Sequence, residues 1–233
     1  MKVESIHSGS SGNAYWVSSG ETNILLDCGV TIHDLQGWAW SHGRQITDLD
    51  ACFVTHEHGD HVKGAQRLIN RGVDVYASKG TIEEAELFLA HQIAHREQIA
   101  VNDMIVMALN VEHDAKEPLA FLLVNSDNER LLYVTDTPKF QYRIPGITHM
   151  MIECNHSYEI MVQAVREGNL PAQHMKRVVK NHMSIETAKL TLERLERSKL
   201  KEVWLLHLSD GNSNAEDFKR QVQELVGVPV YVA

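Results

Sequence analysis

The stretch FVTHEHGDHVKG, residues 53–64, decides the fold and the chemistry expected of this chain. Within six positions it holds three imidazoles and one carboxylate, those of His56, His58, Asp60 and His61. The apolar run at residues 51–54 is predicted to be a buried strand, and Gly59 permits a tight turn after it. The residues that follow, VKGAQRLI, could start a helix. The polar cluster is therefore expected where a strand passes into a turn.

The spacing of these four residues favours two neighbouring cation sites. Side chains two positions apart on an extended strand end point the same way, so His56 and His58 are expected to meet at one point. Asp60 and His61 follow from the turn and can face a neighbouring point. Neutral imidazole and carboxylate both suit Zn²⁺ and similar ions. A solvated, histidine-rich turn is the alternative, and it is disfavoured because clustered polar groups need partners.

The composition is that of an ordinary globular protein. The chain has 233 residues, of which 43% are apolar and 23% charged, and its net charge is −9. Total charge therefore does not support a large phosphate-binding face, although two divalent cations would add four positive charges locally. No apolar run is long enough to cross a bilayer, and the start of the chain lacks the apolar stretch of a signal peptide. Three widely separated cysteines fit a reducing compartment, so we expect a cytoplasmic protein.

Short apolar runs of strand length recur along the chain, and Gly, Asn or Asp often bounds them. They lie near residues 2–7, 14–18, 23–27, 51–54, 73–77, 103–109, 119–125, 131–135, 148–153, 203–207 and 228–232. Helices are expected between them. Their starts are predicted at a capping box of Thr81 with Glu84, at Ser184, and at a box of Ser213 with Glu216. This order favours an α/β domain in which helices cover sheets.

The sequence H-x-H-x-D-H after a short apolar strand resembles the signature of the metallo-β-lactamase superfamily. That resemblance implies a four-layer αββα sandwich, formed here by one domain over residues 1–233. It also implies further ligands, each after an apolar strand. These are His113 in NVEHDA, Asp136 in LLYVTDTP and His207 in VWLLHLSDGN.

The same resemblance implies a binuclear site for two divalent ions, Zn²⁺, Mn²⁺ or Fe. One ion would be held by His56, His58 and His113, the other by Asp60, His61 and His207, and Asp136 would bridge the two. Members of the superfamily that cleave phosphodiesters commonly have this set, and Asp60 could in addition orient the attacking hydroxide.

Further stretches resemble the YycJ/WalJ-type subgroup, whose members are regarded as metal-dependent exonucleases acting on DNA. They are SGSSGNAYWV, ILLDCG, ECNHSYEIM, NHMSIETA and LLHLSDGNS. The chain departs from the subgroup pattern at Ser157, Asn181 and Ile185, where Asp, Gly and Asn are usual. Residues 137–206 are too few for a β-CASP insertion, and the long Gly/Pro-rich arm of tRNA-processing relatives is not found.

Several accessory residues have a functional and a structural interpretation. His182, just before Ser184, could protonate a leaving oxygen, or it could be a surface histidine beside a capped helix. His156 could bind phosphate, orient a ligand or cap a helix. Ser10 and Asn13, in the loop SGSSGN, could contact substrate if that loop is an anion nest, but a hairpin turn explains its glycines equally well.

The only notable basic cluster is HMKRVVKNH, which contains Lys176, Arg177 and Lys180. It could touch a nucleic-acid backbone, or it could be a solvated helix face.

We expect a binuclear metallohydrolase, foremost a phosphodiesterase or DNA exonuclease that uses a metal-bound hydroxide, with nucleic acid as its substrate. One alternative is a hydrolase of a small molecule, such as a cyclic phosphodiester, a lactone or a thioester. Another is a non-catalytic metal-binding scaffold. The sequence gives no indication of the oligomeric state.

Overall fold

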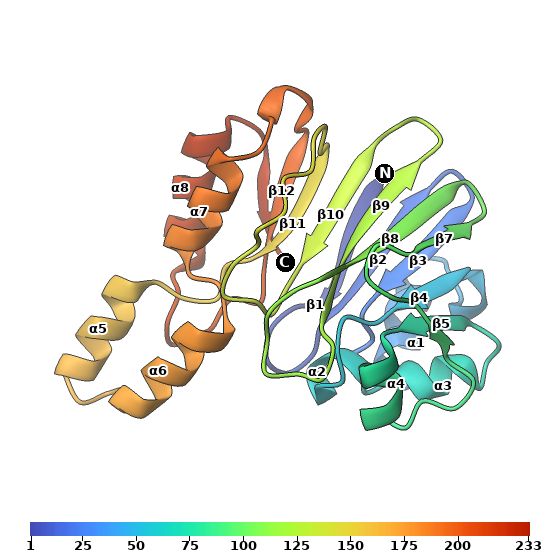
Figure 1. Ribbon diagram of the computed structural model, residues 1–233, viewed down its shortest axis with the longest axis horizontal. Coiled ribbons are helices and arrows are strands. Elements are labelled where there is room, and N and C mark those ends of the chain that lie inside the picture. Colours follow the sequence, from blue (N-terminus) through green and yellow to red (C-terminus); the bar gives the residue numbers. More distant parts are fainter. The chain divides into compact units, whose positions relative to one another are not determined.

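The computed structural model describes all 233 residues, and the chain divides into two compact units. Unit 1 contains residues 1–110 and 115–129, and unit 2 contains residues 111–114 and 130–233. Figure 1 shows the elements of both units along the chain. The single domain expected over residues 1–233 stays a prediction.

Unit 1 is built on a six-stranded sheet in the order β1-β2-β3-β4-β5-β6. Its strands are β1 (Lys2–His7), β2 (Ala14–Ser19), β3 (Thr22–Leu26), β4 (Ala51–Phe53), β5 (Asp74–Ala77) and β6 (His91–Gln92). The first three are antiparallel neighbours, and β3 to β6 run parallel. The parallel strands carry continuous buried runs such as Ala51–Phe53, as expected for strands covered on both faces.

Helices pack on this sheet and bury one face of it. They are α1 (Ile32–Ser41), α2 (Gly59–Val62), α3 (Ala65–Ile69), α4 (Lys79–Glu84) and the short 3-10 turn Ile46–Asp48. Leu35 of α1 and Leu68 of α3 join Trp16, Leu25 and Val75 of the strands in one buried apolar cluster. Unit 1 also contains an antiparallel set of three strands, β7 (Gln98–Val101), β8 (Met104–Asn110) and β9 (Leu119–Asn125).

Unit 2 has four parallel strands in the order β13-β12-β11-β10. They are β10 (Arg130–Val134), β11 (His149–Glu153), β12 (Glu202–Leu206) and β13 (Val230–Val232). Its helices are α5 (Tyr158–Arg166), α6 (Ala172–Asn181), α7 (Ile185–Glu193), the 3-10 turn Arg197–Lys199 and α8 (Ala215–Val226). Because the strands are parallel, the residues that follow β10, β11 and β12 leave the sheet at the same edge.

All eleven strands expected from the apolar runs are present, and their ends differ from the expected ones by at most two residues. Several other elements were not expected, among them β6, β7 and α1. The strand β6 is exposed and carries no apolar run, and β7 carries only a short one at residues 99–101. Helix α1 begins after Thr31, whose side chain accepts a hydrogen bond from the Asp34 backbone N–H, a cap that the Thr-x-x-Asp spacing could have indicated.

Two of the three predicted helix starts were wrong, and the third is confirmed. Helix α4 is capped by Ser78, whose hydroxyl accepts from the Thr81 N–H, so Thr81 lies inside the helix. Helix α8 is capped by Asn214, which accepts from the Asp217 N–H, while the Ser213 hydroxyl donates to the Ser209 carbonyl. At α4 the capping side chain lies three residues before the predicted one, and at α8 it lies one residue after it. Helix α7 is capped by Ser184 as expected.

None of the helices combines the length and the apolar character needed to cross a bilayer.

Candidate metal centre

In unit 1, the loop after β4 brings His56 and His58 together. His56 is buried, and His58 is the N-cap of α2 with an extended backbone. The Nε2 atom of His56 and the Nδ1 atom of His58 lie 3.1 Å apart. The His61 ring, one turn into α2, has its centroid 4.1 Å from that of His56. The three imidazoles predicted from the sequence therefore form one cluster in this unit.

A buried carboxylate fixes the orientation of His61. The Nδ1 atom of His61 donates to Asp27 Oδ2 at 2.8 Å, and both side chains are fully buried. Asp27 also accepts from the Thr55 backbone N–H at 2.7 Å and from the Thr55 hydroxyl. Because Nδ1 carries the proton, the lone pair of His61 is on Nε2, which lies 3.4 Å from Asp60 Oδ2. Asp27 was not expected among the site residues.

Asp27 also has a positive φ of 58°, a conformation that costs energy for a residue other than glycine. The hydrogen bonds that Asp27 accepts from Thr55 and His61 offset this cost. Asp27 could have been recognised in the sequence as a lone carboxylate at the end of the apolar run in ILLDCG.

The loop that follows β3 packs closely on α2. A Cβ atom added at Gly29 would lie 1.7 Å from the Asp60 carbonyl oxygen, so only glycine fits there. The Asn13 side chain lies at this contact. Its Nδ2 atom is 3.1 Å from His61 Nε2, and its Oδ1 atom accepts from the Gly9 N–H and the Tyr15 hydroxyl. The amide of Asn13 is thus engaged inside unit 1, whereas Ser10 is exposed.

In unit 2, the residues that follow the parallel strands form a second cluster. Asp136 and His207 lie just beyond β10 and β12, with positive φ angles of 46° and 54°. His207 Nδ1 is 3.1 Å from Asp136 Oδ1. His113 Nδ1 donates to the Asn181 carbonyl at 3.1 Å, which leaves its Nε2 atom 3.7 Å from Asp136 Oδ2.

Glu153, at the end of β11, holds this cluster together. Its Oε1 atom accepts from His182 Nδ1 at 2.6 Å and lies 3.3 Å from His207 Nδ1. Its Oε2 atom accepts from the backbone N–H groups of Thr137 and Met183. Glu153 is fully buried, and we had not expected it as a site residue. The signal was present in ECNHS, where a carboxylate ends an otherwise apolar strand.

The carboxylates control the protonation of the histidines in unit 2. Burial by itself disfavours a charged His207, but Asp136 and Glu153 outweigh it and raise its pKa to about 10. The same balance, with Glu153 as the main partner, raises the pKa of His182. Burial dominates at His113 and lowers its pKa. Burial opposes the charge of Glu153, yet the nearby His182 and His207 lower the pKa of its carboxyl group.

His182 and His156 occupy different environments. His182 is the C-cap of α6 and its side chain is 22% exposed, so a molecule in solvent can reach it. His156 is fully buried, and neither of its ring nitrogens has a hydrogen-bond partner. Burial lowers the pKa of His156, and its ring contacts that of Tyr158 edge to face. The helix that follows is capped by Ser157 rather than by His156.

The donor atoms fit a divalent transition metal. The ligand atoms of Asp136, Glu153, His182 and His207 all lie within 4.8 Å of one another. In unit 1, His56 Nε2 lies 3.1 Å from His58 Nδ1, and His61 Nε2 lies 3.4 Å from Asp60 Oδ2. Asp27 orients the His61 ring through its hydrogen bond to Nδ1. Histidine backed by a carboxylate or a carbonyl is the usual arrangement of metal ligands in proteins.

Residues 22–208 match the family described as the beta-lactamase superfamily domain. The chain is 28% identical to exodeoxyribonuclease WalJ of Streptococcus pneumoniae over 232 residues, which covers 93% of this chain and 84% of that protein. It is also 28% identical to exodeoxyribonuclease YycJ of Bacillus anthracis over 233 residues, or 94% of this chain and 86% of that one.

Among solved structures, the metallo-beta-lactamase fold protein YhfI of Bacillus subtilis is similar, with a TM-score of 0.74 and 17% sequence identity. The likeness covers 99% of this chain and 95% of that one. It confirms the fold class expected from the sequence, a mixed α/β fold with two sheets covered by helices.

Proposed function

The chain belongs to the beta-lactamase superfamily domain family, and from this premise we propose that it is a metal-dependent phosphodiesterase that removes nucleotides from DNA. Family membership and the exodeoxyribonuclease relatives confirm the expected class of enzyme, a metal-dependent hydrolase. The observation that carries the proposal is the cluster of Asp136, Glu153, His182 and His207 at the carboxyl edge of the parallel strands, which unites ligand groups with a partly exposed imidazole.

We propose that the chain binds two divalent ions, Zn²⁺, Mn²⁺ or Fe. His56, His58 and His113 would hold one ion, Asp60, His61 and His207 would hold the other, and Asp136 would be a ligand of both. The hydrogen bonds that Asp27 and the Asn181 carbonyl accept support this set, because they leave the Nε2 atoms of His61 and His113 as the metal-binding atoms. When bound, such ions lower the pKa of water and stabilise negative charge on phosphoryl oxygens.

The residues of this chain then have separate tasks. Asp60 orients the attacking water. His182 donates a proton to the leaving oxygen, and Glu153 supports it by holding the ring in place and raising its pKa. Ser10, Asn13 and His156 remain the proposed substrate contacts. Of these, only Ser10 is exposed.

DNA is the proposed substrate because of the two exodeoxyribonuclease relatives. The net charge of −9 keeps a small-molecule substrate, namely a cyclic phosphodiester, a lactone or a thioester, as the alternative. A cytoplasmic location is proposed as well, supported by three buried cysteines that are all free thiols.

The test compares the wild-type protein with His58→Ala and, as a control, with His33→Ala, whose side chain is 97% exposed. We expect the wild type and His33→Ala to bind two equivalents of metal and to shorten end-labelled DNA. His58→Ala should lose metal and turnover. Elemental analysis and cleavage assays with DNA, bis-p-nitrophenyl phosphate and a thioester check this. Metal-loaded protein that hydrolyses the thioester but leaves both phosphodiesters intact would overturn the proposal.

A further inference from the structure

Helix α6 carries a basic stripe, which we define as Gln173, Lys176, Arg177 and Lys180. These residues recur at positions i, i+3, i+4 and i+7, so they lie along one side of the helix. All four are exposed. The half-buried residues Met175, Val178 and Val179 lie on another side, and α6 packs against α5. The stripe therefore faces solvent because the apolar side of α6 is turned toward its neighbour.

The stripe is positive in a chain that is otherwise acidic. Helix α6 has three basic and no acidic side chains, whereas the whole chain has a net charge of −9. Neither Lys176 nor Lys180 has an ion-pair partner. Arg177 has one weak contact, 4.0 Å from Asp114, and its side chain is 77% exposed. These cations are thus available to an external anion.

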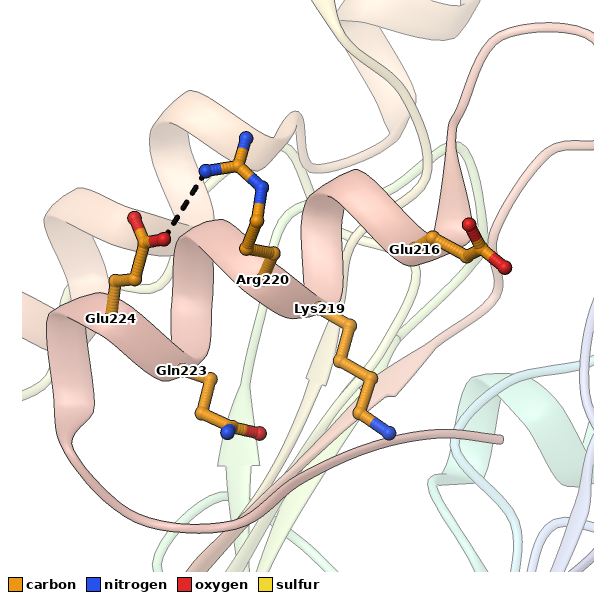
Figure 2. A pocket seen from close by; sticks show the side chains of 5 residues that line it. All are labelled: Glu216, Lys219, Arg220, Gln223 and Glu224. Carbon is orange, nitrogen blue, oxygen red and sulfur yellow. Dashed lines mark hydrogen bonds and ion pairs between the residues drawn. The ribbon is translucent and has the colours of Figure 1, made fainter.

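The basic residues of α8 differ from those of α6 in having acidic residues on the same helix. Lys219 and Arg220 line a recess of about 460 Å³ together with Glu216, Gln223 and Glu224. Figure 2 shows these five side chains on α8. Arg220 is paired there with Glu224 at 3.2 Å and with Asp217 on the same helix. On α8 the positive charges are balanced within the helix, and on α6 they are not.

Helix α6 leads directly into the candidate centre of unit 2. Its last residue, Asn181, accepts from His113 through its carbonyl and donates to Asp114 through its side chain. The next residue is His182, which Glu153 holds. Figure 1 shows α5 and α6 as a helical hairpin at one end of this unit, next to α7. The stripe therefore begins within two residues of His182 and runs away from it along the helix.

We propose that the basic stripe binds successive phosphates of the DNA strand whose scissile bond lies at His182. This proposal rests on the proposed function and identifies the surface that receives the substrate. From Gln173 to Lys180 the stripe is about 10 Å long, the axial distance of about three phosphates in one duplex strand. A strand held there keeps its register on the protein while its end is cleaved.

The test variant is Lys176→Ala/Arg177→Ala/Lys180→Ala. Alanine favours helix, so α6 should persist, and circular dichroism checks this. The matched control, Lys189→Ala/Lys219→Ala/Arg220→Ala, removes the same number of positive charges from α7 and α8. Binding of a fluorescent oligonucleotide to chelator-treated protein is followed by anisotropy over a range of salt concentrations. Cleavage kinetics are measured in parallel with metal-loaded protein.

We expect the α6 variant to bind the oligonucleotide at least about tenfold more weakly, and the slope of log affinity against log salt to fall by about two to three. Its KM for a long strand should rise more than its KM for a dinucleotide, which is too short to reach the stripe. The control variant should retain the wild-type affinity and slope.

Equal losses in both triple variants, or wild-type affinity in the α6 variant, would overturn the proposal, as would a wild type that does not bind DNA. If the wild type cleaves DNA and the α6 variant keeps its affinity, only the stripe is wrong. If the wild type binds DNA through the stripe but metal-loaded protein cleaves no phosphodiester, the proposed function fails and the stripe stands.

Discussion

At the scale of single residues, a substitution of His182 tests its proposed role as the proton donor. Its side chain combines partial exposure with a 2.6 Å hydrogen bond to the buried carboxylate of Glu153. We expect His182→Ala to keep its metal and to cleave DNA about 10²- to 10⁴-fold more slowly. Hydrolysis of bis-p-nitrophenyl phosphate should slow much less, because its leaving group needs no proton. Undiminished DNA cleavage by the variant would exclude the proton-donor role.

Glu57, between the histidines of H-x-H, connects this loop to the start of β9. Its carboxylate accepts from the Lys116 backbone N–H at 2.7 Å and from the Thr81 hydroxyl at 3.4 Å. Next to it, the Leu119 N–H donates to the Thr55 carbonyl. Glu57→Ala should weaken metal binding by about tenfold, because the backbone that carries the ligands loses a support.

Glu57→Gln is the matched variant, since its amide oxygen can still accept from the Lys116 N–H. We expect its metal affinity, measured by isothermal titration calorimetry, to stay within a few-fold of wild type. A glutamine variant as weak as the alanine variant would show that the charge of Glu57 matters rather than its hydrogen bond.

The proposed ligand residues were expected from the sequence because each one follows an apolar strand. The residues that hold these ligands in place through hydrogen bonds could not be predicted. Asp27, Glu57 and Glu153 act through hydrogen bonds to segments that are 16 to 59 positions away along the chain, and local patterns do not encode such partners. What the sequence does offer is a carboxylate at the end of an apolar run, at Asp27 and Glu153.

At the scale of the elements, the contact between α2 and the loop that follows β3 depends on Gly29. A Cβ atom there would overlap the backbone of Asp60, which cannot move without displacing α2. We expect Gly29→Ala to lower the free energy of unfolding by at least about 1–3 kcal/mol. The measurement is urea unfolding of the metal-free protein.

Gly37 is the control for this experiment. It lies inside α1, and a Cβ atom there would meet nothing within 4 Å. Gly37→Ala should therefore stabilise the protein by about 0.5–1 kcal/mol through helix propensity. If both substitutions had the same small effect, the close approach at Gly29 would be without energetic consequence.

Strand positions followed from the apolar runs because buried parallel strands need continuous apolar residues. Helix starts were less predictable. At α4 and α8 several side chains could each cap the helix, and the choice among Ser78 and Thr81, or Ser213 and Asn214, depends on where the chain leaves the preceding strand or loop. Short edge strands such as β6 carry no pattern because they bury little.

At the scale of the whole molecule, His207 links folding stability to pH. Its pKa in the folded protein is about 10, above the ordinary value of 6.5. A raised pKa contributes stability that is fully present below pH 6.5 and is lost as the pH rises through 10. We expect the urea midpoint of the metal-free protein to fall over this range, and to fall less in His207→Gln, which does not titrate.

Metal should reverse this trend, because cations compete with protons for the same histidines and bind more tightly as the pH rises. With saturating Zn²⁺ or Mn²⁺ the midpoint should hold steady or rise between pH 6.5 and 8. A metal-free midpoint that does not change with pH, or the same slope in His207→Gln, would contradict the role given to His207.

The chain passes between its two units three times, at residues 110–111, 114–115 and 129–130. The short excursion of residues 111–114 carries His113, whose hydrogen-bond partner Asn181 belongs to the later stretch. No single cut can therefore yield two self-sufficient fragments. A fragment ending at residue 129 would keep His113 but lose Asn181, so bisected versions of this protein should regain metal only when both pieces are produced together.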